Sequence, residues 1–71
     1  MEIDIWPTAF RHGVNESDIL HALRNPLKGI VGANEMYLII GGAQDGRVLE
    51  IGFGDTGAVV HVMTARRKYW P

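Results

Sequence analysis

The chain has 71 residues, of which 46% are hydrophobic and 21% charged, with a net charge of −1 and no cysteine. This length fits a single domain over residues 1–71, and the composition excludes a disordered chain, which would be poorer in apolar residues and richer in net charge. The lack of cysteine excludes a disulfide framework and a thiolate zinc site, so packing must hold the domain together.

No apolar run in the sequence approaches the roughly 18 residues that are needed to cross a bilayer. The first residues also lack the basic region of a signal peptide. We therefore expect a cytoplasmic protein that makes no contact with a membrane.

The N-terminal residues predict two short elements. Residues 2–6 alternate between acidic and apolar side chains, which is typical of an edge strand, and Pro7 ends it because proline cannot donate to a sheet. Residues 8–12 predict one helical turn, closed by Gly13.

The next segment carries the clearest helix signals. Asn15 is a good N-cap, and Asp18 follows three residues later, where a carboxylate suits the positive end of a helix. Pro26 ends the helix by disfavouring helical geometry in the residue before it. One apolar stripe is formed by Ile19, Leu20 and Leu23.

The rest of the chain predicts strands. They are expected over residues 27–32, 36–40, 47–53 and 58–64, with glycine-rich turns at 41–46 and 54–57. Two consecutive hairpins make a meander. The fold class is therefore α+β, with one or two N-terminal helices packed on one face of an antiparallel sheet of three to five strands.

The turn positions predict a register for the last three strands. The first hairpin would place Tyr37 opposite Glu50, and the second would place Glu50 opposite His61. These three side chains would then share one row on the mixed face of the sheet. The helix would cover the other face, with a core formed by Met36, Leu38, Ile40, Leu49, Ile51, Phe53, Val60 and Val62.

The predicted row has the residue types of an acid–base site. A carboxylate opposite an imidazole can transfer protons near neutral pH. The alternative is a cross-strand pair of Glu50 and His61 that only stabilises a solvated sheet face.

The last residues are basic and aromatic. Arg66, Arg67 and Lys68 are followed by Tyr69 and Trp70. Guanidinium groups bind phosphate in a bidentate manner, and aromatic rings stack on unpaired bases, so this segment predicts a nucleic-acid contact. The alternative is a frayed, solvated terminus whose Trp70 packs into the core.

The remaining histidines carry weaker signals. His12, next to Arg11, is expected to solvate a helix end, with contact to a ligand as the alternative. His21 is expected to be exposed on the helix. The three histidines lack the spacing of a metal site, so we expect no metal and no other cofactor.

Five segments occur in a familiar order: His12-Gly13-Val14, a capped helix ending at Asn25-Pro26, Tyr37 to Gly41, Asp45 to Glu50, and His61 to Arg67. Their order and spacing, from about Arg11 to Lys68, resemble the BrnT-like toxin family, which belongs to the RelE/ParE-like toxins of type II toxin–antitoxin systems. The resemblance implies a RelE-like fold, inhibition of translation through RNA cleavage, and a small cognate antitoxin as partner.

The resemblance aligns two parts of this chain with basic positions of the family. These are Arg47 and the segment Ala65-Arg66-Arg67. The family usually has an apolar or basic residue at the place of His61, so a catalytic His61 follows only from the predicted register. The resulting hypothesis is a metal-independent ribonuclease in which Glu50 or His61 takes the proton from a ribose 2′-hydroxyl. Arg66 and Arg67 would complete the catalytic set by stabilising the charge that develops on the phosphate. The substrate would be held by Tyr37, Arg47, Lys68 and Tyr69.

Two further interpretations stay open. The chain could be a non-catalytic RNA- or protein-binding module on the same scaffold, with RNA or the ribosome as partner. It could also be an interaction protein that forms a homodimer through an exposed sheet edge.

Overall fold

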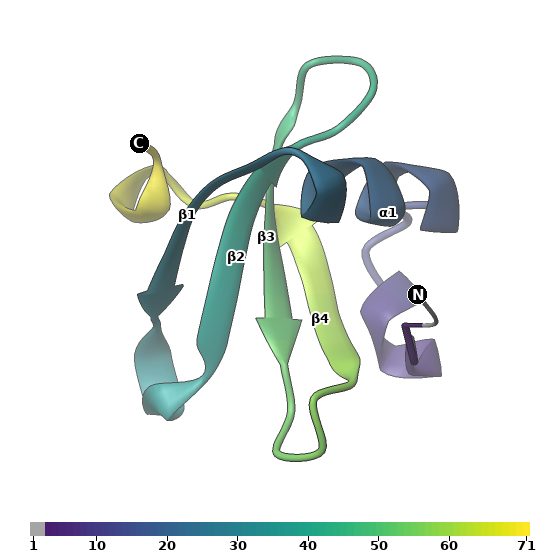
Figure 1. Ribbon diagram of the computed structural model, residues 1–71, viewed down its shortest axis with the longest axis vertical. Coiled ribbons are helices and arrows are strands. Elements are labelled where there is room, and N and C mark those ends of the chain that lie inside the picture. Colours follow the sequence, from purple (N-terminus) through teal and green to yellow (C-terminus); the bar gives the residue numbers. More distant parts are fainter. Residues whose placement is uncertain (1–2) are drawn as a thin grey trace.

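One α-helix and four antiparallel strands make up the domain in the computed structural model, which describes residues 3–71 (Figure 1). The helix is α1 (Glu16–Arg24), and the strands are β1 (Pro26–Val31), β2 (Tyr37–Gly42), β3 (Val48–Phe53) and β4 (Val59–Thr64). Three short 3₁₀ helices within residues 3–71 are η1 (Pro7–Phe10), η2 (Ala33–Glu35) and η3 (Arg67–Tyr69). The sheet order β1-β2-β3-β4 confirms the predicted α+β meander. No helix in this described part is long and apolar enough to span a membrane.

Helix α1 forms where its capping signals predicted it. Asn15 is the N-cap, and its side-chain oxygen accepts a hydrogen bond of 2.9 Å from the backbone N–H of Asp18. Pro26 follows the helix closely and begins β1. Burial on the apolar face is complete at Ile19 and partial at Leu20 and Leu23.

The predicted N-terminal strand is reduced to a single bridge. Residues 1–2 lie outside the described part of the chain, and Ile5 forms an isolated parallel bridge with Val59 of β4. The Val59 N–H donates to the Asp4 carbonyl at 2.8 Å. The predicted helical turn is η1, which lies slightly earlier than expected, and Gly13 follows with a φ of 80°. The N-terminal segment therefore lies against β4.

The predicted register of β2 and β3 is wrong by three residues. Ile40 lies opposite Glu50, and Tyr37 lies opposite Phe53. The cause is Gly41, which continues the strand beneath α1 although its sequence context predicts a turn. A Cβ at Gly41 would collide with the backbone carbonyl of Ala22, so only glycine allows the helix and the strand to approach this closely. An odd shift moves every side chain of β2 to the other face relative to β3.

The observed register of β3 and β4 differs from the predicted one by two residues. Because the shift is even, the side chains of β4 keep their predicted faces relative to those of β3. Glu50 lies opposite Met63, and His61 lies opposite Gly52. A bulge at this point places Phe53 opposite Val59. Glu50 and His61 are therefore diagonal neighbours on one face, not a directly opposed pair.

The sheet has a core on each face. On the face under α1, the buried residues include Leu49, Ile51 and Val62. On the other face, Leu38 and Ile40 pack against the C-terminal segment, and Figure 1 shows this segment across the sheet from α1. The predicted single core is therefore wrong: Leu38 and Ile40 belong to the second face, with Met36 packed against them, and Val60 lies half-buried in the bulge.

Candidate functional site

The centre of the site is Glu50, whose side chain is completely buried in β3. A buried carboxylate is costly unless it is paired and fully hydrogen-bonded. Here its two oxygens accept from His61 and from Arg66, and no buried side-chain polar atom of the described chain is left without a partner. The expected closeness of Glu50 and His61 is thus confirmed, but the carboxylate lies in the interior and not on an open face.

Arg66 binds Glu50 through both its backbone and its side chain. Its backbone N–H donates to Oε1 at 2.9 Å, Nε donates to Oε1 at 3.2 Å, and Nη2 donates to Oε2 at 2.9 Å. Arg66 directly follows Ala65, whose N–H still donates to Val48 of β3 at 2.8 Å. Glu50 therefore fixes the point at which the C-terminal segment leaves the sheet.

His61 reaches Glu50 because the residue opposite it has no side chain. A Cβ at Gly52 would collide with Met36 Sδ and lie 3.2 Å from His61 Cβ. The His61 Nε2 lies 3.0 Å from Glu50 Oε2. An ionised carboxylate can only accept a hydrogen bond, so Nε2 carries the proton in this contact. In neutral His61 the Nδ1 atom is then the nitrogen that can accept a proton.

The hydrogen bonds keep Glu50 ionised. Burial by itself raises the pKa of Glu50 and is the largest single effect. The hydrogen bonds from Arg66 and His61 together outweigh it, so the pKa of Glu50 lies below its ordinary value. The hydrogen bond with Glu50 in turn raises the pKa of Arg66.

A pocket of about 160 Å³ opens beside this network. It is lined by Asn34, Met36, Leu38, His61 and Arg66. The side chain of Arg66 is 47% exposed and that of His61 is 25% exposed, so both reach solvent although the carboxylate that holds them does not. The arrangement presents one imidazole and one guanidinium to a small polar cavity.

His12 adds a second imidazole next to the first. The ring centres of His12 and His61 are 5.9 Å apart, and the rings meet edge to face. His12 is exposed, as expected for a residue that solvates a helix end, but its ring contact with His61 was not predicted. The segment that carries His12 docks on β4 through the Ile5–Val59 bridge and the hydrogen bond from Thr8 Oγ1 to the Val60 carbonyl, which are long-range contacts without a local sequence signal.

Asn34 was not expected at this site either. Asn34 and Glu35 both have positive φ, 59° and 60°, in the connection between β1 and β2. Asparagine tolerates this left-handed conformation, and here it brings Asn34 to the pocket. The signal in the sequence was the Gly-Ala-Asn-Glu run before β2.

The structure places Arg47 elsewhere. Its Nη2 lies 3.1 Å from Asp18 Oδ2, and its Nε lies 2.8 Å from Asp45 Oδ2. The hydrogen bond from the Arg47 backbone N–H is the largest effect that lowers the pKa of Asp45. Arg47 therefore ties the β2–β3 turn to α1 and is not part of the pocket beside Glu50.

Tyr37 is also separated from this network. It lies opposite Phe53 on the α1 side of the sheet, with the two ring centres 6.1 Å apart. The predicted row of Tyr37, Glu50 and His61 is therefore wrong, because the three-residue shift places Tyr37 on the other face.

The C-terminal segment is packed on the sheet and not frayed. Tyr69 is buried, whereas Trp70 is 47% exposed, so the alternative of a frayed terminus whose Trp70 packs into the core is wrong. Trp70 Nε1 donates to the Ala65 carbonyl at 2.8 Å, and its own carbonyl accepts from Lys28 Nζ at 3.1 Å. The exposed Arg67 lies 5.8 Å from the Trp70 ring centre.

Two cationic side chains lie over the ring of Tyr69 in cation–π contacts. The Arg66 guanidinium lies 5.2 Å and Lys68 Nζ lies 5.1 Å from its ring centre. Because Tyr69 is buried in the second core, its ring holds these cations instead of offering a free stacking surface.

The expected exposure of His21 is not observed. Its Nδ1 lies 2.6 Å from the Gly42 carbonyl, and the side chain is half-buried between α1 and β2. A carbonyl accepts only, so Nδ1 carries the proton. His21 therefore has a structural contact away from the Glu50 network.

Within residues 3–71, no group of three or more His, Cys, Asp or Glu side chains is arranged to hold a metal ion. Comparisons with protein-family models, curated proteins and solved structures found no match to the chain. The resemblance to the BrnT-like toxins thus rests on the segments quoted for it, and membership of that family stays a prediction.

Proposed function

We propose that the protein is a metal-independent ribonuclease whose active site is the pocket beside Glu50. One observation carries this proposal. A completely buried carboxylate holds an imidazole and a guanidinium at the edge of the same pocket, each by direct hydrogen bonds. Such a contact fixes the geometry of both groups before any substrate binds, as catalysis requires.

The residues present match the needs of RNA cleavage by the neighbouring 2′-hydroxyl. His61 Nδ1 takes the proton of the 2′-hydroxyl, and the 2′ oxygen attacks the phosphorus. The bond from phosphorus to the 5′ oxygen breaks, and protonated His12 gives its proton to that leaving oxygen. The products are a 2′,3′-cyclic phosphate and a free 5′-hydroxyl.

Arg66 would stabilise the charge that develops on the phosphate. Its guanidinium uses Nε and Nη2 on Glu50, and the side chain remains 47% exposed, so further N–H groups can reach a non-bridging oxygen. Positive groups that are already held in place at the developing charge are among the largest contributions to catalysis.

Glu50 has a different role in this mechanism from the one first expected. It is buried, ionised and fully hydrogen-bonded, so it does not accept the proton of the substrate. It acts as a positioning residue that orients His61 and holds Arg66.

The exposed cations of the C-terminal segment would bind the rest of the RNA. Arg67 and Lys68 lie beside Arg66 in sequence, and Lys28 contacts the same segment. Backbone contacts of this kind give affinity without sequence preference.

A non-catalytic RNA- or protein-binding module is the second candidate. The observation that favours it is that Glu50 also anchors the C-terminal segment through the Arg66 backbone, so the network has a structural use without catalysis. If the protein is such a binding module, the resemblance to toxins suggests an antitoxin-like protein or RNA as its partner.

Cleavage of a single-stranded RNA oligonucleotide in the presence of EDTA separates the two candidates. The ribonuclease proposal predicts fragments that end in a 2′,3′-cyclic phosphate, and no cleavage at a position with a 2′-deoxy sugar. Cleavage of the deoxy-substituted position would contradict the mechanism. Salt-dependent binding without any cleavage would contradict the ribonuclease and support the binding module.

A further inference from the structure

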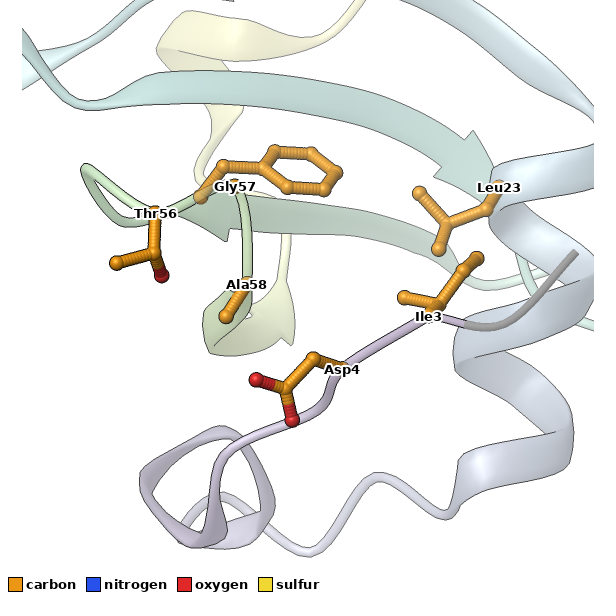
Figure 2. Close-up of a pocket in the computed structure, with 7 residues that line it drawn as sticks. Ile3, Asp4, Leu23, Thr56, Gly57 and Ala58 are labelled. Atoms are coloured by element: carbon orange, nitrogen blue, oxygen red, sulfur yellow. The ribbon is translucent and has the colours of Figure 1, made fainter.

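A larger pocket, of about 520 Å³, lies between the N-terminal segment, the end of α1 and the β3–β4 turn (Figure 2). Its described lining residues are Ile3, Asp4, Leu23, Phe53, Thr56, Gly57 and Ala58. Phe53 and Leu23 belong to the face of the sheet under α1, whereas Glu50 faces the other way. This pocket is therefore separate from the proposed ribonuclease site.

The pocket has an apolar wall and a charged rim. Ile3, Leu23 and Phe53 are half-buried and pack against the core under α1, and Figure 2 shows the side chains of Ile3 and Leu23 next to each other. The exposed polar residues Asp4 and Thr56 belong to the same lining. Among the described lining residues, Asp4 carries the charge.

The position of the Asp4 carboxylate is held from two sides. The Asp4 carbonyl accepts from the Val59 N–H at 2.8 Å, which fixes the backbone against β4. The carboxylate Oδ2 accepts from Trp6 Nε1 at 3.2 Å. A carboxylate has about four acceptor positions, so this contact leaves room for a donor from a ligand.

We propose that this pocket binds a small primary amine with a compact apolar body. The apolar part would pack against Leu23 and Phe53, and the ammonium group would pair with Asp4. The volume lies within the range of about 300–1,000 Å³ that is usual for small-molecule sites. A ligand carboxylate would be repelled by Asp4, so the sign of the charge selects the ligand class.

Two probes with the same phenylethyl body and opposite charge test this inference. We would titrate ¹³C-methyl-labelled protein with 2-phenylethylamine and, separately, with 3-phenylpropionate. The proposal predicts saturable shifts of the Ile3, Leu23 and Ala58 methyl signals with the amine, and none with the carboxylate. Asp4→Asn should weaken amine binding by about tenfold, the size of one charge-assisted hydrogen bond.

Asp55→Asn is the matched control, because Asp55 is an exposed carboxylate in the adjacent turn that does not line the pocket. It should bind the amine like the wild type. Asparagine at position 4 can still accept from Trp6, and an unchanged Ile5 and Val59 amide spectrum would show that the segment stays docked. Equal shifts with both probes, no saturable shifts, or equal affinity in Asp4→Asn with its segment docked would each overturn the proposal.

Discussion

Glu50 and Arg66 are 16 residues apart in the chain and are joined by three hydrogen bonds, one from the backbone N–H of Arg66 and two from its guanidinium. The carboxylate therefore determines both the path of the C-terminal segment and the position of a cation at the pocket. His61 donates to the same carboxylate. The stability of the fold and the geometry of the candidate site thus depend on one buried side chain.

Replacing Glu50 by Gln should destabilise the protein. Glutamine keeps the shape, but its NH₂ group cannot accept from Arg66 or His61, so charge-assisted hydrogen bonds are lost. We expect a loss of about 1–3 kcal/mol in the free energy of unfolding, measured by denaturant titration at pH 7. Glu35→Gln, at an exposed carboxylate, is the control and should change stability by less than about 0.5 kcal/mol.

The same residue should make the wild type sensitive to acid. The pKa of Glu50 is lowered in the folded protein, so the unfolded chain takes up the proton first as the pH falls. The stabilisation is complete above the ordinary value of 4.5 and is lost as the pH falls below it toward the lowered pKa. Glu50→Gln should therefore lose less stability than the wild type over this range, and parallel pH profiles would show that Glu50 is not responsible.

The contact between α1 and β2 predicts a contrast between adjacent glycines. Gly41→Ala places a methyl group against the Ala22 carbonyl and should cost about 1–3 kcal/mol by overpacking. At Gly42 a Cβ would meet nothing within 4 Å, so Gly42→Ala is the matched control and should fold with near wild-type stability. Equal denaturant midpoints for the two variants would mean that α1 does not pack here.

The tautomer of His61 can be observed directly. The hydrogen bond to ionised Glu50 predicts that neutral His61 carries its proton on Nε2, whereas His21 carries it on Nδ1 because it donates to the Gly42 carbonyl. Two-bond ¹H–¹⁵N correlation spectra of the imidazole rings distinguish these forms. An Nδ1–H form of His61 would contradict the assignment of Nδ1 as the proton acceptor.

The C-terminal cations should control the salt dependence of RNA binding. Arg66 is unsuitable for this test because its removal leaves Glu50 buried without its guanidinium partner, so the change is made at Arg67 and Lys68. The double Ala variant should bind single-stranded RNA more weakly, and the slope of log K against log salt should flatten by about 0.7 for each lost phosphate contact. Arg24→Ala, on α1, should leave the slope unchanged.

Local signals predicted the elements well, since each depends on nearby residues. The Asn15 cap, the Pro26 stop and the runs of β-forming residues lie at or within a few residues of the observed boundaries. The register failed because Gly41 and Gly42 resemble turn residues, whereas Gly41 is required by contact with a helix about twenty residues earlier. Such a requirement cannot be read from the strand alone.

The site was predicted only in part for the same reason. Glu50 and His61 do meet, but through a bulge and a diagonal contact. Burial of Glu50 depends on the C-terminal segment folding back over the sheet, and the segment that carries His12 docks on β4 through long-range contacts. These long-range contacts carry no periodic signal in the sequence.

The rate of RNA cleavage by His61→Ala, compared with the wild type and with His21→Ala, tests the central claim most directly. His21 is the matched control because it is a histidine outside the pocket, and circular dichroism should show that both variants stay folded. If His61 is the proton acceptor, its removal should slow single-turnover cleavage by on the order of 10²–10⁴-fold, while RNA binding is retained and His21→Ala keeps the wild-type rate. A wild type that cuts no RNA, or a folded His61→Ala variant that cuts as fast as the wild type, would contradict the claim.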